Sequence, residues 1–87
     1  MSGILITPFN NYEFIPDKGQ IEFLSFEGGG FFGIKSNDGK YYDPINLPDE
    51  YKIDGLHVIF LAKGLKNQTT YHLWARVVEL VIIKMAK

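Results

Sequence analysis

Residues 31–47, FFGIKSNDGKYYDPINL, contain two β-rich runs separated by a turn. The turn carries Asp38-Gly39, and Asp-Gly between two such runs is among the strongest short-range signals for a β-hairpin, because glycine adopts a positive φ at no steric cost. Pro44 cannot donate a backbone hydrogen bond, so the second run should lie at a sheet edge or carry a bulge there. The stretch predicts a hairpin at the centre of a β-sheet domain.

Three further runs complete the predicted sheet: 20–27, 56–64 and 69–87. The first is apolar on both faces, and its buried face changes near Phe23–Leu24, which is typical of a bent barrel strand. Only PDEYKIDG, opened by Pro48 and closed by Gly55, predicts a helical turn. We therefore expect an all-β fold, a five-stranded Greek-key β-barrel of the oligonucleotide/oligosaccharide-binding (OB) type with at most one short helical turn. A small SH3-like barrel, which also has five strands, is the alternative.

The chain of 87 residues predicts a single domain, 1–87. Its 46% hydrophobic and 15% aromatic residues are enough for a compact core. Residues 10–19 are rich in the turn formers Asn, Pro, Asp and Gly. We therefore expect 1–19 to form an N-terminal arm or edge strand and 20–87 to form the barrel.

Gly28-Gly29-Gly30-Phe31-Phe32-Gly33 matches the G-x-G-x-x-G spacing of dinucleotide-binding loops. That chemistry needs a helix N-terminus directly after the glycines, to present its N–H groups to the phosphate. Here a β-rich run and a hairpin turn follow instead, so we expect no cofactor. The structural prediction is that glycines 28–30 bend or bulge the chain between the first two strands and that Gly33 admits a close neighbour.

Net charge is −1, which gives no overall electrostatic signature of nucleic-acid binding. The distribution is uneven: residues 1–50 carry 3 basic and 8 acidic side chains, and residues 51–87 carry 6 and 2. The absence of cysteine excludes disulfides and thiolate metal sites. The N-terminal sequence has no charged signal region, and no apolar stretch approaches the ~20 residues of a transmembrane helix. These features predict a cytoplasmic protein that does not insert into membranes.

No arrangement of Ser, Thr or His suggests an activated nucleophile, and the two histidines, on the last two predicted strands, do not suggest a metal site. We therefore expect no enzymatic activity. The remaining feature is the aromatic residues, which in OB domains stack bases beside basic side chains. Strand alternation turns one ring of each adjacent pair inward, so core packing or an interface accounts for most of them. The candidate interaction surface is Phe31, Lys35, Tyr42, Lys63, Trp74 and Arg76.

The function predicted from these features is a small, non-enzymatic binding or interaction module of unknown ligand. The alternative is an OB domain that binds single-stranded nucleic acid. The partner is accordingly a protein or a single-stranded nucleic acid, and the oligomeric state is left open.

Residues 29–82 resemble a family of small, largely uncharacterised OB-like domains of prokaryotes. The matching elements are Gly33-Ile34, Asp38-Gly39, Tyr42-Asp43-Pro44-Ile45-Asn46-Leu47-Pro48, Asp54-Gly55-Leu56 and His72-Leu73-Trp74. Ala75-Arg76 stands where the family has glycine after the tryptophan, which argues against a close backbone approach there. The resemblance implies the OB fold and implies no activity or ligand, because fold does not carry function. Within the DPINLP segment we expect Asn46 to bond backbone groups near the turn and Pro48 to end strand pairing.

Overall fold

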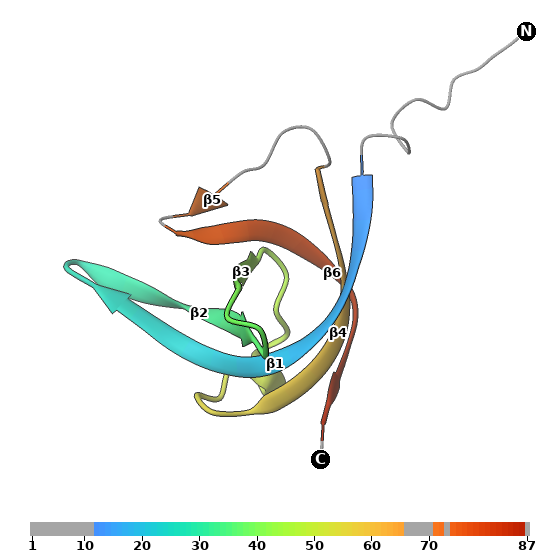
Figure 1. The fold of residues 1–87 in the computed structure, drawn as a ribbon. Helices are drawn as coiled ribbons and strands as arrows, with labels where there is room; N and C mark the ends of the chain where they lie inside the picture. Colours follow the sequence, from blue (N-terminus) through green and yellow to red (C-terminus); the bar gives the residue numbers. More distant parts are fainter. Residues whose placement is uncertain (1–11, 66–70, 73, 87) are drawn as a thin grey trace, which may run out of the picture.

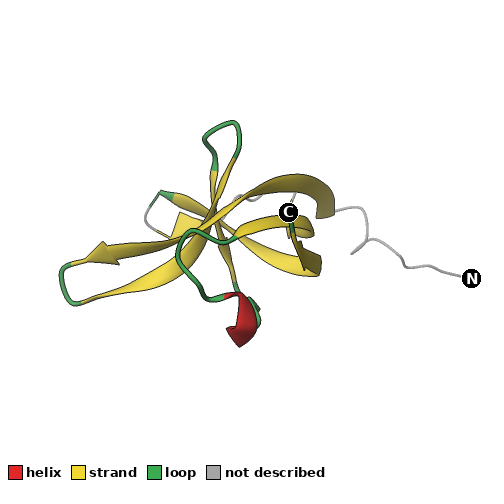
Figure 2. Cartoon of the chain, turned by 90° about the horizontal axis from the view of Figure 1, so that it is seen from below, coloured by secondary structure: helices red, strands yellow, loops and turns green. Residues whose placement is uncertain are grey.

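The computed structural model describes residues 12–65, 71–72 and 74–86, and this part of the chain is almost entirely β-structure (Figure 1). The elements, in chain order, are β1 (Tyr12–Phe26), β2 (Gly29–Ser36), β3 (Tyr41–Pro44), a 3₁₀ turn (Asp49–Tyr51), β4 (His57–Leu65), β5 (Tyr71–His72) and β6 (Ala75–Met85). Figure 2 shows the 3₁₀ turn as the one helical element of the described chain. The fold is all-β, as predicted.

Five strands close into a ring. β1 pairs antiparallel with β2, β2 with β3, β4 with β6 and β1 with β4, whereas β3 and β6 run parallel. The order around the ring is therefore β1-β2-β3-β6-β4, and β4 returns to β1. The two-residue β5 adds to the start of β6 and is not one of the ring strands.

β1 is long enough to pair with two different strands along its length. Tyr12–Gln20 pairs with β4, and Gly19–Phe26 pairs with β2. Of the predicted N-terminal arm or edge strand, 1–19, residues 12–19 therefore form part of a ring strand, while residues 1–11 lie outside the described part. The turn-forming composition misleads here because Pro16, Asp17 and Gly19 each have a place in the strand. Asp17, for example, accepts hydrogen bonds from the Lys18 N–H at 2.8 Å and from the Tyr42 hydroxyl at 3.3 Å.

Gly19 marks the point where β1 passes from one neighbour to the other. A Cβ at this position would lie 2.7 Å from the Ser36 Cα and closer still to the Lys35 carbonyl oxygen. Only glycine lets the two backbones approach so closely. The change of buried face predicted near Phe23–Leu24 agrees with the burial along β1: Ile21 is buried, whereas Phe23 is exposed and Leu24 is half-buried, on the arm formed by the ends of β1 and β2.

The core fills the inside of the ring. Ile21, Ile34 and Val58 are fully buried, and they come from β1, β2 and β4 respectively. The other members of the buried cluster are Tyr42, Leu47, Phe60, Ala62, Val78 and Leu80. Every ring strand thus contributes at least one residue to a single core.

Candidate functional site

A groove of about 650 Å³ opens where the first half of β1 faces the start of β3 and β6. We call it the mouth groove. The residues that line it are Glu13, Phe14, Ile15, Pro16, Gly39, Lys40, Tyr41, Tyr42, Trp74 and Arg76. It combines an aromatic wall with a polar floor.

The aromatic wall consists of Trp74 and Tyr41. Trp74 is 52% exposed, and its ring meets that of Tyr41 edge-on, with centroids 6.5 Å apart and an interplanar angle of 82°. The Lys35 ammonium lies 5.8 Å from the centroid of the Tyr41 ring, within the range of a cation–π contact. A half-exposed indole beside a second ring offers an apolar surface on which a planar group can stack.

The polar floor is formed by Arg76 and Glu13, which join β6 to β1 across the groove. Their Nη1 and Oε2 atoms are 2.6 Å apart, and the Arg76 side chain is 18% exposed. Gly64 makes room for the guanidinium, because a Cβ there would lie 3.0 Å from Nη2. The positive charge of Arg76 is therefore already compensated by a carboxylate, and a partly buried, charge-assisted pair of this kind fixes the floor.

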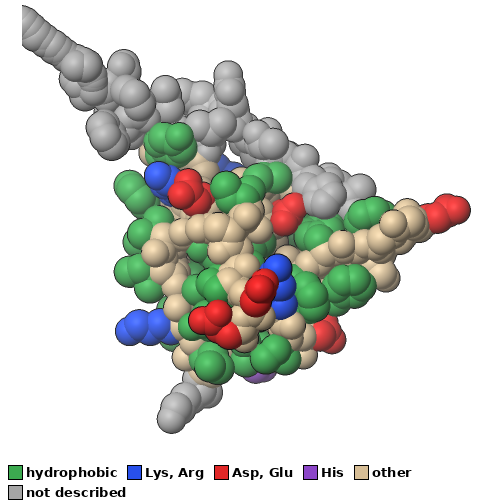
Figure 3. All heavy atoms as spheres, turned by 180° about the vertical axis from the view of Figure 1, so that it is seen from behind, with side chains coloured by type: hydrophobic (Ala, Val, Ile, Leu, Met, Phe, Trp, Pro, Cys, Tyr) green, Lys and Arg blue, Asp and Glu red, His purple; other side chains and the backbone are tan. Residues whose placement is uncertain are grey.

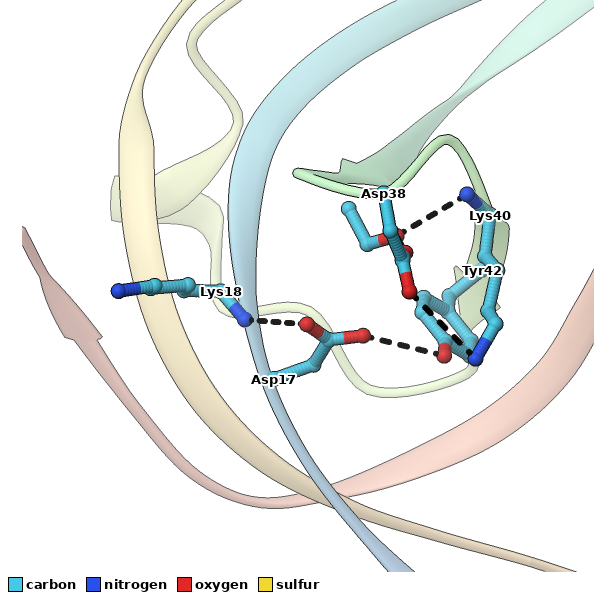
Figure 4. A network of polar contacts seen from close by, with 6 residues as sticks. Asp17, Lys18, Asp38, Lys40 and Tyr42 are labelled. Carbon is cyan, nitrogen blue, oxygen red and sulfur yellow. Dashed lines mark hydrogen bonds and ion pairs between the residues drawn. The ribbon is translucent and has the colours of Figure 1, made fainter.

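Tyr42 is a core residue and not the exposed ligand contact that the sequence predicted. Its side chain is 3% exposed and lies edge-on to Phe60, with centroids 5.7 Å apart. Its hydroxyl donates a hydrogen bond to Asp17 Oδ2 (Figure 4). Burial, reinforced by the negative charge of Asp17, raises the pKa of Tyr42 to about 12. Tyr42 is nevertheless among the residues that line the mouth groove.

The β2–β3 turn closes one end of the groove. Ser36 N donates to the Lys40 carbonyl at 2.8 Å, so the loop has three residues, 37–39, with Gly39 at φ +93°. The Ser36 hydroxyl donates to Asp38, and the Lys40 ammonium lies 3.7 Å from the same carboxyl group (Figure 4). The hydrogen bond from Ser36 is the largest cause that lowers the pKa of Asp38 below its ordinary value, and the charge of Lys40 lowers this pKa further. Lys40 is thus held at the groove next to a neutralising carboxylate.

The mouth groove brings together three of the six residues predicted for the interaction surface: Tyr42, Trp74 and Arg76. Lys63 lies outside its lining, 3.8 Å from Glu79. Phe31 lies on the β1–β2 arm and lines another groove, of about 380 Å³, while Lys35 contacts the Tyr41 ring but is not among the residues that line the mouth groove. The predicted surface is therefore not one continuous patch.

Sequence reasoning missed Tyr41, Lys40, Glu13 and the β1 stretch 14–16 as groove residues. The signal for Tyr41 lies in strand register. Residues directly opposite each other share a face of the sheet, and Tyr42 pairs with the fully buried Ile34. Tyr41 must then point the other way, towards Trp74.

The glycines singled out for structural roles differ in their surroundings. Gly28, in the β1–β2 turn, has a φ value of +93°, and Gly55, two residues before β4 begins, has a φ value of +91°. A Cβ on Gly30 would lie 2.5 Å from the Phe23 ring, and a Cβ on Gly33 would lie 3.0 Å from the Tyr42 carbonyl oxygen. Gly29 has no atom within 4 Å of such a Cβ, so nothing in the structure requires glycine there.

Both prolines of the DPINLP segment lie at the ends of elements. Pro44 is the last residue of β3 and lies beyond the last β2–β3 pair, so its missing N–H leaves no β2 partner unsatisfied. Pro48, with φ −65°, precedes the 3₁₀ turn.

Apolar side chains also reach the surface away from the mouth groove, interspersed with Lys and Asp/Glu side chains (Figure 3). Some of them lie side by side, because Pro16, at the mouth groove, pairs with Leu61 and Leu61 pairs with the exposed Ile82 on neighbouring strands. Among residues 12–65, 71–72 and 74–86, no group of three His, Cys, Asp or Glu is placed to hold a metal ion. Nor does the described chain contain a helix long and apolar enough to cross a membrane.

Comparison of the chain with protein-family models, with curated proteins and with solved structures gives no match. The resemblance to the prokaryotic OB-like domains therefore stays a prediction.

Proposed function

We propose that this protein is a non-enzymatic binding module built on an OB-like barrel and that its ligand lies in the mouth groove. The observation that carries the proposal is the aromatic wall: the chain's only tryptophan is half exposed and stands edge-on to Tyr41 at an open groove. Leaving an indole in water forgoes the free energy of burying it, so an exposed ring in a concave site is a frequent sign of a ligand surface.

The ionisable groups of the groove support binding rather than proton transfer. Glu13 is held by Arg76 at 2.6 Å. The pKa of Tyr42 is raised to about 12, so its hydroxyl stays protonated at neutral pH. A general acid or base works best with a pKa near the operating pH, and these groups are arranged as fixed structural contacts instead.

Single-stranded nucleic acid is the second candidate, favoured by the proximity of Lys35 and Lys40 to the aromatic wall. Bases stack on exposed rings while lysines contact the phosphates. Against it, three cations of the predicted surface and groove, Lys40, Lys63 and Arg76, each lie within 4.0 Å of a carboxylate. We therefore rank a ligand of low charge, with a planar or apolar group for the Trp74–Tyr41 wall, above nucleic acid.

Fluorescence anisotropy of a labelled oligothymidylate at low salt separates the two candidates. The nucleic-acid candidate requires binding that weakens as salt rises and that is lost in Trp74→Leu. The matched control is Phe26→Leu, which removes an exposed ring from the β1–β2 arm, outside the mouth groove. If the native protein gives no anisotropy change at about 50 μM, nucleic acid is eliminated as the ligand. If both variants bind equally well, the mouth groove is not the site.

A further inference from the structure

The first half of β1 borders the mouth groove with a row of backbone groups. Tyr12–Lys18 pairs with β4 on one side, and the pairs of β1 with β2 begin only at Gly19 (Figure 1). Within residues 12–65, 71–72 and 74–86, no strand pairs with Tyr12–Pro16 on the side turned away from β4, which we call the β1 edge. Glu13–Pro16 also lines the mouth groove, so the β1 edge and the groove belong to one surface.

Hydrogen bonds next to Gly19 show which backbone groups point to the β1 edge. The Lys18 carbonyl accepts from Asn37 N at 3.0 Å, on the β2 side of the strand, whereas the Ile21 N–H donates to the Leu56 carbonyl at 2.7 Å, on the β4 side. In an antiparallel ladder both backbone groups of a residue point to the same edge, and successive residues alternate between the two edges. The register with β4 is unbroken from Tyr12 to Gln20, so the even-numbered residues before Lys18 direct their backbone groups to the β1 edge.

The β1 edge offers both acceptors and donors. Tyr12, Phe14 and Pro16 each direct a carbonyl to it, and Tyr12 and Phe14 also direct an N–H. These residues follow one another at roughly 6.7 Å, which is the repeat of alternate residues in any extended polypeptide. A second strand therefore matches the edge in both spacing and hydrogen-bonding groups. The phosphates of a nucleic acid accept hydrogen bonds and donate none, so they would leave the three carbonyls without partners.

The charges around the β1 edge favour a strand with uncharged side chains. Natural edge strands are commonly protected by charged side chains, but none of the three residues that face this edge is charged. In the groove, Arg76 and Lys40 already have carboxylate partners at 2.6 Å and 3.7 Å. A ligand without charge leaves both pairs intact.

We propose that the ligand of the mouth groove is an extended polypeptide segment with uncharged side chains, which pairs with the β1 edge as an added strand. This inference rests on the proposed function and names the class of its ligand. Residues directly opposite each other in a sheet share a face, so side chains of the added strand opposite Glu13 and Ile15 lie on the side of these two groove residues. An apolar or aromatic side chain there packs against the exposed ring of Trp74 and against Tyr41.

Selection from a phage-displayed library of random heptapeptides, with the full chain as the target, supplies the probe. Each enriched peptide is synthesised with its backbone N-methylated at alternate residues, in each of the two possible phases. One phase of an added strand turns its N–H groups to β1, and the other phase turns them away. Methylation in the first phase should weaken binding about tenfold or more, and methylation in the second should leave it within about twofold. Equal effects of the two phases would overturn the inference, as would a library that yields no peptide that shifts the Trp74 indole resonance.

Amide hydrogen exchange locates the added strand on the protein. The Phe14 amide should exchange in the free protein and become protected when a selected peptide binds, whereas the Ile15 amide, which points to β4, should be protected in both states. Phe14→Pro removes the ring and the outward N–H, and the matched control Phe14→Ala removes the ring alone. The proline variant should bind the peptide more weakly than the alanine variant, and equal binding by the two folded variants would contradict the backbone pairing. Thermal melts report whether both fold, and if the proline variant does not, exchange at Phe14 decides.

The inference and the proposed function fail on different observations. Ligands that shift the Trp74 indole resonance without protecting the Phe14 amide would overturn the added strand and retain the mouth groove as the site. A Phe14 amide that is already protected in the free protein would also overturn the added strand, because the β1 edge would then be covered. If no ligand of any class shifts the indole resonance, the proposed function itself fails.

Discussion

The side-chain amide of Asn46 binds both backbone groups of Leu80. Asn46 Oδ1 accepts from the Leu80 N–H at 2.8 Å, and Nδ2 donates to the Leu80 carbonyl at 3.0 Å. The amide thus continues the parallel β3–β6 pairing beyond Pro44, where β3 ends. The sequence suggested that Asn46 bonds backbone groups near the turn, but its partner lies 34 residues away and holds the ring closed.

Replacing Asn46 tests this connection. Asn46→Ala leaves the partly buried N–H and C=O of Leu80 without these partners, so we expect a loss of about 2 kcal/mol in the free energy of unfolding. Asn46→Asp keeps the acceptor and places a carboxylate against the Leu80 carbonyl, so it should be no better than alanine near pH 7. Urea unfolding measures both variants. Asn46→Asp as stable as the native protein would show that the bond to the carbonyl contributes nothing.

Replacing Gly19 and Gly29 by alanine compares a crowded position with an open one. A Cβ on Gly19 would collide with the backbone of Lys35 and Ser36, which cannot move without breaking the β1–β2 ladder. We expect Gly19→Ala to cost about 3 kcal/mol. Gly29→Ala meets no atom within 4 Å and should be neutral or stabilising by about 0.5 kcal/mol. Thermal melts compare them, and equal melting temperatures would contradict the close crossing at Gly19.

Gly33 tests the packing inside β2. A Cβ there would lie 3.0 Å from both the Tyr42 carbonyl oxygen and Leu24 Cδ1. The two extra methyl groups of valine have no space against these atoms, so Gly33→Val should lose about 2 kcal/mol of stability. A variant that keeps the native melting temperature would show that this strand has more room than the structure gives it.

Tyr42 makes the fold sensitive to alkali. Its pKa is raised from the ordinary 10.0 to about 12, so the folded state favours the protonated phenol. The resulting stability is fully present below pH 10 and is lost as pH rises from 10 through 12. We expect one tyrosine to titrate later than the others in absorbance at alkaline pH. Tyr42→Phe should remove that late step and reduce the loss of stability between pH 10 and 12. A native titration curve without a late step would contradict the assignment.

Local sequence signals correctly predicted the elements whose conformation is set by residues close together in the chain. Asp38-Gly39 marks the β2–β3 turn, the DPINLP segment leads to the 3₁₀ turn, and the β-branched run near the C-terminus is β6. Each of these depends on backbone preferences within a few residues. The ring itself also follows, because five amphipathic strands must close or pair to cover their apolar faces.

The residues of the candidate site depend on the pairing register between β2 and β3, which local sequence signals do not determine. A two-residue loop at Asp38-Gly39 would place Tyr42 opposite Lys35, on the outer face. The observed loop of three residues, 37–39, places Tyr42 opposite Ile34, in the core. A shift of one residue exchanges the two faces of a strand, so it exchanged the roles of Tyr41 and Tyr42.

The strand formed by residues 12–19 could not be predicted from the sequence for a different reason. Pro16, Asp17 and Gly19 are turn formers in composition, and each is accommodated by a partner far away in sequence. Pro16 lies opposite Leu61 of β4, Asp17 accepts a hydrogen bond from Tyr42, and Gly19 packs closely against the backbone of Lys35 and Ser36. Because these contacts are long-range, no local reading of residues 12–19 reveals the strand.

The indole N–H of Trp74 provides the most direct test of the mouth groove. As the only tryptophan, it gives a single indole cross-peak in a two-dimensional ¹H–¹⁵N spectrum. Titration with a panel of planar aromatic fragments, extended peptides and an oligothymidylate should reveal binders that shift this cross-peak together with the amides of Lys40 and Tyr41. Binders that instead shift the amides of Phe23 and Phe31 and leave the indole unchanged would place the site on the β1–β2 arm and contradict the account.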